Sequence, residues 1–572
     1  MQKSDYSADV VIVGAGISGA LMALGLAKAN AKVLIIEAGD RIDRSKAIEK
    51  YKADPERGDD SPYNPVSRTA PYPPMDDPQQ YYIQMGPDKF QSTYIKAVGG
   101  TTWHWLGTCL RFVENDFKMK TEYGVGTDWP ITYKEIEKWY FAAEQEIPVS
   151  GDSNAALGVK REKPYPSAMI PQTYLDKQVD IAFQNLNLPD ATDIKLQVAS
   201  TPQGRLSAPQ DERLACCGSN NCIPICPVGA KYDASFTIAK AEALGVKVLT
   251  NSTAKFIQTD DEGSVTGILF QTADGDKIAA GKIFILAGHA IETPKLMLMS
   301  KTEKYPNGIA NSSDQVGRNL MDHNCVLSYG LTKDPVYPYQ APLSTSGVEN
   351  VKDGPFRKER GAFRIEIGND GWSWPVGYPN VLSSYFLKKS GGRSSVMNLP
   401  VTDEVIKQGQ NNLLYGKKLR NDIKENVLRE IRFAFLCEQL PDPNNRIVPA
   451  FDSLGTDGLP RPRIFYKLDD YVKASIDVAV TLQKSMLDSL GCTQQHHSYP
   501  WGAGHIVGTT KMGDDPKTSV VDKNLKCHDL KNMYILGSSV FPTVAASNPT
   551  LTIAALTLRA VEEIQKKLLE LN

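Results

Sequence analysis

The sequence lacks both a long apolar segment and a long run of basic residues. No stretch of about eighteen consecutive apolar residues occurs in the 572-residue chain, which excludes a membrane-spanning helix. Lys and Arg number 64 against 66 Asp and Glu, so the net charge of -2 offers no basic excess for nucleic acid. The first residues also lack a signal peptide's apolar core and cleavage site, and we expect any export to depend on another protein.

A disulfide framework is missing as well. The chain has nine cysteines, an odd number, and four of them lie between Cys216 and Cys226. The other five are scattered, and we interpret them as small buried apolar residues: Cys109, Cys325, Cys437, Cys492 and Cys527. The clustered four therefore indicate one local site. No His-x-x-x-His spacing, internal repeat or low-complexity segment accompanies it.

The bulk composition is that of a globular protein with more than one core. Charged residues make up 23% and hydrophobic residues 41% of the chain, and its length predicts two lobes. Residues 9–37 predict a strand, a tight turn, a helix and a second strand, which is the start of an α/β fold. A Pro- and Asp-rich stretch, roughly residues 53–88, has too little apolar content for a core, and we interpret it as an excursion that covers the first lobe.

The turn in this first unit has the glycine spacing of a dinucleotide site. Gly14 permits a tight turn, Gly16 lets the backbone approach a pyrophosphate, and Gly19 allows close packing of helix and strand. The helix then presents free N–H groups to the phosphates. Glu37 ends the second strand, where a carboxylate accepts hydrogen bonds from ribose hydroxyls and disfavours NADP. A glycine-rich turn without a ligand is the alternative, and the motif does not separate FAD from NAD.

Two further segments favour FAD. Residues 99–105, GGTTWHW, form a small-residue turn followed by aromatic bulk, which suits contact with a flat ring system. Residues 534–539, YILGSS, predict a strand that runs into a Gly-Ser turn able to hold a ribityl chain or a phosphate.

These segments resemble the glucose-methanol-choline (GMC) oxidoreductase family. Its signature is matched by the run from Gly504 to Gly513 and by Ser547 to Thr552, and the resemblance extends from residue 9 to about residue 565. Within the family, the chain is similar to flavoprotein subunits of bacterial glucose, fructose, sorbitol and gluconate dehydrogenases. The motifs that indicate this branch are GGTTWHW, CCGSNNCIPICPVGA, GRNLMDH and LPDPNNRIV.

The resemblance implies a fold and a set of cofactor contacts. The fold is α/β, with a Rossmann-like FAD-binding domain from residues 1–110, 205–330 and 495–572. A substrate-binding domain with a mixed sheet takes residues 111–204 and 331–494. The residues expected to contact FAD are Gly14, Gly16, Gly19, Glu37, Gly99, Gly100, Thr101, Thr102, Ala254, Gly537, Ser538, Asn548, Pro549 and Thr550.

The resemblance also assigns a catalytic pair. Oxidation of an alcohol carbon needs a base for the hydroxyl proton, and His505 in its glycine-rich turn is the candidate. Asn548 occupies the second catalytic position, where an amide can hold the substrate oxygen. The alternatives are a structural His505 and an Asn548 that caps a helix. His104 is expected near the flavin, His323 in a structural hydrogen bond, and His496 and His497 at a surface or domain boundary.

The clustered cysteines predict an iron-sulfur site over residues 216–227. Thiolates are the usual ligands of such clusters, and Cys226 precedes a proline as in ferredoxin-type loops. Adjacent side chains cannot easily reach one small cluster, so three ligands, Cys216, Cys222 and Cys226, fit a [3Fe-4S] cluster, the type that the resemblance implies. The choice between Cys216 and Cys217 is open. Zinc and a disulfide between Cys216 and Cys217 are the alternatives, although paired C-x-x-C knuckles are missing.

We therefore expect an FAD-dependent dehydrogenase that acts on a sugar, polyol or sugar acid. Its electrons would leave through the cluster to a cytochrome c-type acceptor. The resemblance implies a small export-chaperone subunit and a multihaem cytochrome c subunit, hence a periplasmic enzyme held at the inner membrane by its partners. The alternatives are an oxygen-reducing oxidase, a non-catalytic flavoprotein or lyase, and a cytoplasmic location.

The substrate itself stays open. Glucose- and fructose-oxidising members of the branch typically place Asn before the catalytic histidine, where this chain has Gly504. Because glycine has no side chain beside the base, we expect an enlarged or reshaped substrate pocket. Glu438 and Gln439 are candidate substrate contacts that the sequence alone does not rank.

Overall fold

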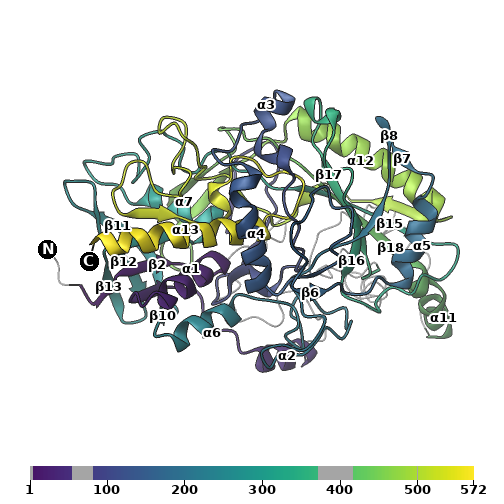
Figure 1. Ribbon diagram of the computed structural model, residues 1–572, viewed down its shortest axis with the longest axis horizontal. Coiled ribbons are helices and arrows are strands. Elements are labelled where there is room, and N and C mark those ends of the chain that lie inside the picture. Colours follow the sequence, from purple (N-terminus) through teal and green to yellow (C-terminus); the bar gives the residue numbers. More distant parts are fainter. Residues whose placement is uncertain (1–3, 54–80, 372–415, 499, 572) are drawn as a thin grey trace.

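The computed structural model describes residues 4–53, 81–371, 416–498 and 500–571. Its elements form two parts along the long axis: a parallel sheet lies in one part, together with both marked chain ends, and a larger antiparallel sheet lies in the other (Figure 1). Most of the excursion predicted over residues 53–88 falls outside the described residues.

A five-stranded parallel sheet forms the centre of the first part. The strands are β2 (Val10–Val13), β3 (Val33–Ile36), β10 (Lys247–Leu249), β14 (Ile283–Leu286) and β23 (Met533–Ile535), in the order β10-β3-β2-β14-β23. Both β3 and β14 are buried throughout, as their continuous apolar runs predict. Because all five run the same way, the loops that follow them gather at one edge of the sheet, which is where α/β folds bind ligands.

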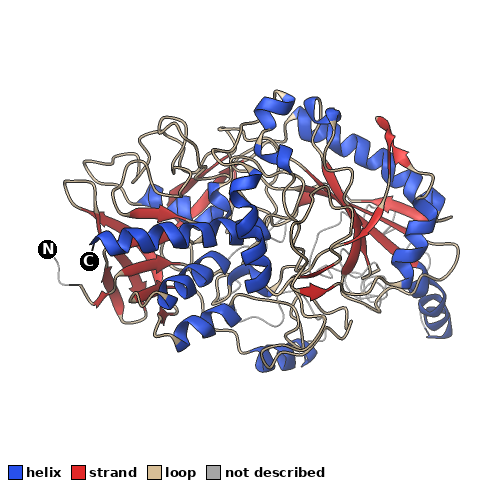
Figure 2. Ribbon diagram, viewed as in Figure 1, coloured by secondary structure: helices blue, strands red, loops and turns tan. Residues whose placement is uncertain are grey.

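Helices pack closely on this sheet. Helix α1 (Ile17–Lys28) is almost entirely buried and packs against β2, β3, α6 (Ser235–Ala243) and α13 (Thr550–Leu571). Gly25 allows α13 to approach, because a Cβ there would lie 2.6 Å from Val561 Cγ1. Helix α4 (Tyr133–Glu146) packs on α13 in turn (Figure 2). The helix that opens at the glycine turn is thus held rigidly from several sides.

A seven-stranded sheet organises the second part. Its order is β21-β15-β18-β17-β16-β9, with β22 paired to β15, and every pairing is antiparallel. The strands are β9 (Val198–Ser200), β15 (Asn324–Leu331), β16 (Ser344–Val348), β17 (Phe363–Gly368), β18 (Glu430–Cys437), β21 (Thr493–His497) and β22 (Trp501–Gly502). Helices α5 (Tyr174–Phe183) and α12 (Asp470–Ser489) pack on it around a second apolar core.

Strand pairing in the seven-stranded sheet is antiparallel throughout, whereas we expected a mixed sheet in the substrate-binding domain. Parallel and antiparallel pairing meet in a three-stranded sheet, where β20 (Pro460–Phe465) joins β19 (Arg446–Leu454) antiparallel and β4 (Ile83–Gln84) parallel. They meet again in a four-stranded sheet, where β1 (Tyr6–Ser7) lies parallel to β13 (Gly275–Ala280) beside two antiparallel pairs. The connection between β16 and β17, residues 349–362, contains no α-helix and returns the chain beside β16 as an antiparallel neighbour, whereas parallel neighbours usually need a helical crossover.

The remaining elements are smaller. A four-stranded sheet contains β1 (Tyr6–Ser7), β11 (Thr253–Thr259), β12 (Val265–Thr272) and β13 (Gly275–Ala280). Two-stranded ribbons join β5 (Ser150–Gly151) to β6 (Ser167–Ala168) and β7 (Asn187–Leu188) to β8 (Ala191–Lys195). Further helices are α2 (Arg44–Ala53), α3 (Met119–Tyr123), α7 (His289–Met299) and α11 (Gly416–Asn426), with 3-10 turns η2 (Gly100–Trp103), η3 (Glu114–Phe117), η4 (Pro355–Lys358), η5 (Val427–Arg429) and η6 (Ser538–Val540).

The predicted α/β fold with its Rossmann-like first unit is confirmed. Strand β9, from residues 111–204, pairs with β16 from residues 331–494, which is the grouping expected for the substrate-binding lobe. Strand β15 begins at Asn324 and joins the same sheet, although the predicted FAD-binding range extends to residue 330. None of the helices in the described ranges has the length and apolar character needed to cross a membrane.

Candidate active site

The glycine turn between β2 and α1 is tightly packed. Gly14 has φ +103°, and a Cβ there would lie 2.5 Å from the Ala287 carbonyl oxygen. A Cβ on Gly19 would lie 2.0 Å from the Gly14 carbonyl oxygen, so Gly19 brings helix and turn together. Gly16 differs, because a Cβ there meets nothing within 4 Å. No side chain caps the first N–H groups of α1, which leaves them free for an anion.

Glu37 is buried directly behind this turn. Its Oε2 accepts from the Ala15 backbone N–H at 2.7 Å and its Oε1 from the Gly39 N–H at 2.8 Å. Burial raises the pKa of the carboxyl above its usual value, and the bonds from Gly39 and Ala15 act against that rise. The carboxylate therefore anchors the loop, and its remaining lone pairs can accept hydroxyl donors.

One cavity of about 210 Å³ joins the glycine turn to His505. Most of the predicted FAD contacts line it, namely Gly14, Gly16, Glu37, Gly100, Thr101, Thr102, Ala254, Gly537, Ser538, Pro549 and Thr550. Gly19, Gly99 and Asn548 do not: Gly19 packs beneath the turn, and Gly99, with φ +102°, places η2 against it. The segments from both ends of the chain thus form one elongated site.

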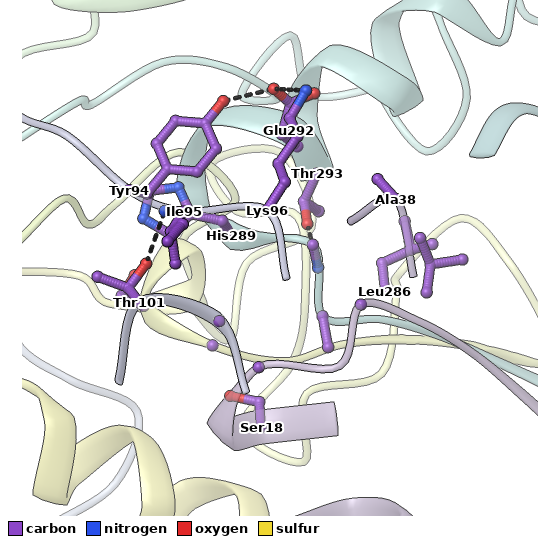
Figure 3. A pocket seen from close by; sticks show the side chains of 18 of the residues that line it. Ser18, Ala38, Tyr94, Ile95, Lys96, Thr101, Leu286, His289, Glu292 and Thr293 are labelled. Atoms are coloured by element: carbon purple, nitrogen blue, oxygen red, sulfur yellow. Dashed lines mark hydrogen bonds and ion pairs between the residues drawn. The ribbon is translucent and has the colours of Figure 1, made fainter. Parts of the chain in front are cut away.

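The cavity also has a polar wall that the sequence did not reveal. Tyr94 stacks on His289 with ring centroids 4.3 Å apart, and its hydroxyl donates to Glu292 (Figure 3). Glu292 also pairs with Lys96 at 3.3 Å and with Lys295 at 2.8 Å. These ion pairs hold the pKa of Glu292 far below its usual range in spite of burial. Residues 94–96 and helix α7 are far apart in sequence, so no local pattern could have linked them.

His505 lines this cavity from a loop that Asp322 holds by hydrogen bonds. The His505 backbone N–H donates to Asp322 Oδ1 at 2.8 Å, and Ser92 donates to Asp322 Oδ2. Burial raises the pKa of Asp322 to about 8, although hydrogen bonds from four backbone N–H groups lower it. Burial lowers the pKa of His505 well below 6.5, and the neighbouring His323 and Arg364 lower it further. The imidazole is therefore neutral at pH 7, the state that a base requires.

Asn548 faces His505. Asn548 Nδ2 lies 3.2 Å from His505 Nε2, and Asn548 Oδ1 accepts from Arg364 Nη1 at 2.9 Å. Because a guanidinium can only donate, this contact fixes which end of the amide is oxygen. Arg364 is fully buried and pairs with Glu349 at 2.8 Å. The predicted catalytic pair is therefore brought together, with the N–H of the amide turned toward the histidine.

Other candidates occupy supporting places. His323 is fully buried, and its Nδ1 lies 2.7 Å from His505 Nδ1. Glu438 pairs with Arg357 at 2.7 Å, and Gln439 Oε1 accepts from Tyr466 Oη at 2.8 Å, so both are engaged in the protein interior. His496 and His497 lie in β21, and Trp105, beside His104, lines the cavity.

The cysteine loop lies next to two buried cations. Cys222 and Cys226 are buried and Cys216 is half-buried, whereas Cys217 is exposed. Arg205 Nη1 donates to Cys222 Sγ at 3.0 Å, and the Lys231 backbone N–H donates to Cys226 Sγ at 3.5 Å. Within the described ranges, no group of three or more His, Cys, Asp or Glu side chains is arranged to hold a metal ion.

Comparison with known proteins identifies the family. GMC oxidoreductase profiles match residues 196–325 and 452–557, and a Rossmann-like NAD(P)-binding profile matches residues 12–45. The fructose dehydrogenase large subunit of Gluconobacter japonicus is 34% identical, with 99% of each chain covered. The gluconate 2-dehydrogenase flavoprotein of Pantoea cypripedii is 21% identical, covering 98% of this chain and 94% of its own.

A solved structure shows the same fold. Pyridoxine 4-oxidase from Mesorbium loti superposes with a TM-score of 0.62 at 17% identity, covering 98% of this chain and 99% of its own. At this low sequence identity, the similarity concerns the fold alone. The fold, the cavity and the full-length sequence similarity agree, and the chain belongs to the GMC oxidoreductase family, in the dehydrogenase-subunit branch, as an FAD-dependent enzyme.

Proposed function

We propose that this chain is the catalytic subunit of a dehydrogenase that oxidises an alcohol carbon of a sugar, polyol or sugar acid. The observation that supports this most directly is the contact of 3.2 Å between His505 Nε2 and Asn548 Nδ2 at the FAD cavity. The relatives named above act, by their names, on fructose and gluconate. Both of these compounds carry alcohol groups on a carbon chain.

The two residues divide the work on the substrate hydroxyl. FAD held in this cavity would supply the acceptor for the hydride, with its two electrons, that leaves the C–H bond of the carbinol. His505, neutral at pH 7, takes the hydroxyl proton at Nε2 as the C=O bond forms. Asn548 donates its Nδ2–H to the same oxygen and stabilises the negative charge that develops there. Arg364 keeps that donor pointed at the substrate by holding the amide oxygen.

Gly504 bears on the size of the substrate. Its φ of +75° is a left-handed conformation that glycine adopts freely, and the nearest atom to a Cβ there is the Thr93 carbonyl oxygen at 3.7 Å. The space beside His505 is therefore open where relatives of the branch place a side chain. We propose a substrate bulkier than a simple hexose, or a different reacting carbon.

The experiment that tests the catalytic proposal is anaerobic flavin reduction. Mixed with a panel of aldoses, ketoses, polyols, sugar acids and disaccharides, the purified flavoprotein should bleach with at least one class. His505→Gln should bind FAD normally and reduce it about 10²- to 10⁴-fold more slowly, which is the usual contribution of a general base. Asn548→Leu should also be slow. A wild-type rate in His505→Gln would contradict the assignment.

We also propose an iron-sulfur cluster at residues 216–227, bound by Cys216, Cys222 and Cys226. Its support is electrostatic. Arg205 and Lys231 are each 1% exposed, and neither belongs to an ion pair within 4.0 Å among the described residues. Lys231 Nζ instead donates to three backbone carbonyls. Buried cations without an anion cost several kcal/mol each, and a thiolate-bound cluster would supply the missing negative charge.

The exposed neighbour Cys217 gives a matched control for the ligands. Iron and sulfide analysis with electron paramagnetic resonance should show a three-iron signal in the wild type and in Cys217→Ser. Cys216→Ser, one position away, should lose the signal and its iron. Protein purified without air and containing no iron would rule the cluster out, and loss in Cys217→Ser with retention in Cys216→Ser would exchange the two ligands.

With a cluster as the electron exit, the acceptor would be a cytochrome c-type subunit. The Gluconobacter japonicus relative is, by its name, a large subunit, which supports partner subunits for this chain. We propose that these partners are a small export-chaperone subunit and a multihaem cytochrome c. Periplasmic location at the inner membrane follows from that proposal. Dye reduction that greatly exceeds oxygen consumption would support it. Stoichiometric hydrogen peroxide formation would favour the oxidase alternative instead.

A further inference from the structure

His323 contacts the catalytic histidine from the side away from Asn548. The two imidazole rings are perpendicular, with an interplanar angle of 88° and centroids 4.9 Å apart. His323 Nδ1 lies 2.7 Å from His505 Nδ1, and His323 Nε2 lies 2.8 Å from the Ala545 carbonyl oxygen. Two ring nitrogens that face each other this closely need one proton between them, so their protonation states are linked.

The carbonyl of Ala545 decides where the proton of His323 lies. A carbonyl oxygen can only accept, so the nitrogen that faces it, His323 Nε2, carries the proton. His323 is fully buried, and the pKa of its imidazole is lowered to about 4 by that burial, so the ring carries a single proton at neutral pH. His323 Nδ1 is consequently a hydrogen-bond acceptor.

That acceptor determines the tautomer of His505. The bond of 2.7 Å then requires the proton of His505 to reside on Nδ1. His505 Nε2 is left with a lone pair, and this is the nitrogen that faces the Nδ2–H of Asn548. Arg364 fixes the amide independently from its oxygen end. All three links agree on one arrangement, although they come from three separate partners.

We propose that His323 is a positioning residue that holds His505 in the Nδ1–H tautomer and so presents the Nε2 lone pair to the substrate. The inference deepens the proposed function and rests on His505 being the base. Without His323, His505 could place its proton on Nε2 and meet the substrate hydroxyl with a donor in place of an acceptor. The ring would also lose its fixed orientation.

The test begins with the wild-type protein. Spectra of ring-¹⁵N-labelled histidine resolve the seven imidazoles, and His505→Gln identifies the His505 signals by their disappearance. We expect a directly bonded proton on His505 Nδ1 and a pyridine-like Nε2. A proton on His505 Nε2 in the wild type would overturn the proposal, and this measurement needs neither substrate nor a His323 variant.

Variants then test the kinetic consequence. His323→Phe removes the acceptor and should slow flavin reduction by about 10²- to 10⁴-fold, which is the usual contribution of a general base, with the substrate dissociation constant changed less than about threefold. His323→Asn places an oxygen near the position of Nδ1 and should recover at least about tenfold of that loss. His528→Gln is the control, because His528 bonds to Ser519 Oγ at 2.9 Å outside the site.

The outcomes separate the two proposals. Reduction at the wild-type rate in His323→Phe, or no recovery in His323→Asn while both variants bind FAD, would contradict the role of His323. A normal rate in His505→Gln would instead overturn the proposed base, whatever tautomer the spectra show.

Discussion

Burial, together with positive charge nearby, makes the proton affinity of His505 unusually low. Burial has the largest effect on its pKa, and the neighbouring His323 and the cationic Arg364 lower the pKa further. Asp322 lies close by, but its Oδ1 accepts from the His505 backbone N–H and not from the imidazole ring. The base is therefore surrounded by groups that oppose its protonation.

The pH dependence of flavin reduction follows from this. His505 acts only when neutral, and its pKa is below 6.5, so the rate constant should stay constant from pH 8 down to pH 6.5 and fall only at lower pH. Stopped-flow reduction between about pH 5 and pH 8 measures the acid limb. Arg364→Gln removes a lowering charge and should move that limb to higher pH, besides slowing the reaction. An acid limb centred at or above pH 6.5 in the wild type would contradict the neutral base.

Residues that act through distant partners could not be predicted. The sequence motifs identified His505 and Asn548 by resemblance, and the structure places them in contact. His323 was expected to be structural, because nothing local shows that it meets a residue 182 positions away. Arg364 was not singled out at all, since a strand arginine 184 positions from Asn548 carries no motif. Only the grouping of GRNLMDH with the branch motifs offered a signal for His323.

At the scale of the elements, the first strand-turn-helix unit was predictable. The apolar runs of β2 and β3 and the glycine spacing are local, and the strands fall at Val10–Val13 and Val33–Ile36. Pairing partners across the large sheet depend on contacts that no single segment encodes.

Two glycines of the turn should respond differently to alanine. Gly19→Ala places a Cβ 2.0 Å from the Gly14 carbonyl oxygen and should destabilise the apoprotein by about 1–3 kcal/mol through overpacking. Gly16→Ala meets no protein atom within 4 Å, so the apoprotein should keep its stability. FAD affinity should nevertheless fall at least about tenfold, because the added methyl group faces the predicted pyrophosphate.

Urea unfolding of both apoproteins and fluorescence titration with FAD measure the two effects. Each variant is the control for the other. Equal loss of stability in both variants would contradict the open space beside Gly16. Unchanged FAD affinity in Gly16→Ala would show that the pyrophosphate does not bind at this turn.

At the scale of the whole molecule, the cofactor cavity depends on segments from the entire chain. Its lining runs in sequence from Val13 to Ile553 and includes Glu37, Ala254 and His505. A ligand that fills it should therefore stabilise the protein as a unit. FAD at about 1,000 times its dissociation constant should add about 4 kcal/mol.

Comparison of FAD with FMN tests this length requirement. FMN lacks the adenosine half for which Glu37 and Ala254 provide contacts, so it should raise the melting temperature of the apoprotein by less than half as much as FAD at equal concentration. Differential scanning calorimetry of the apoprotein with each ligand gives the comparison. Equal shifts would show that the adenosine end of the cavity contributes nothing to binding.

The closing of this cavity by the last helix has a consequence for biosynthesis. Thr550 opens α13 beside the cofactor site, and α13 packs on α1, which follows the glycine turn near the other end of the sequence (Figure 1). During translation the glycine turn leaves the ribosome long before the loop of His505 and the start of α13, which lie far downstream in the sequence. The flavin is therefore enclosed after translation, and a chain stalled before residue 505 would leave the ribosome without its catalytic histidine and with an open cofactor site.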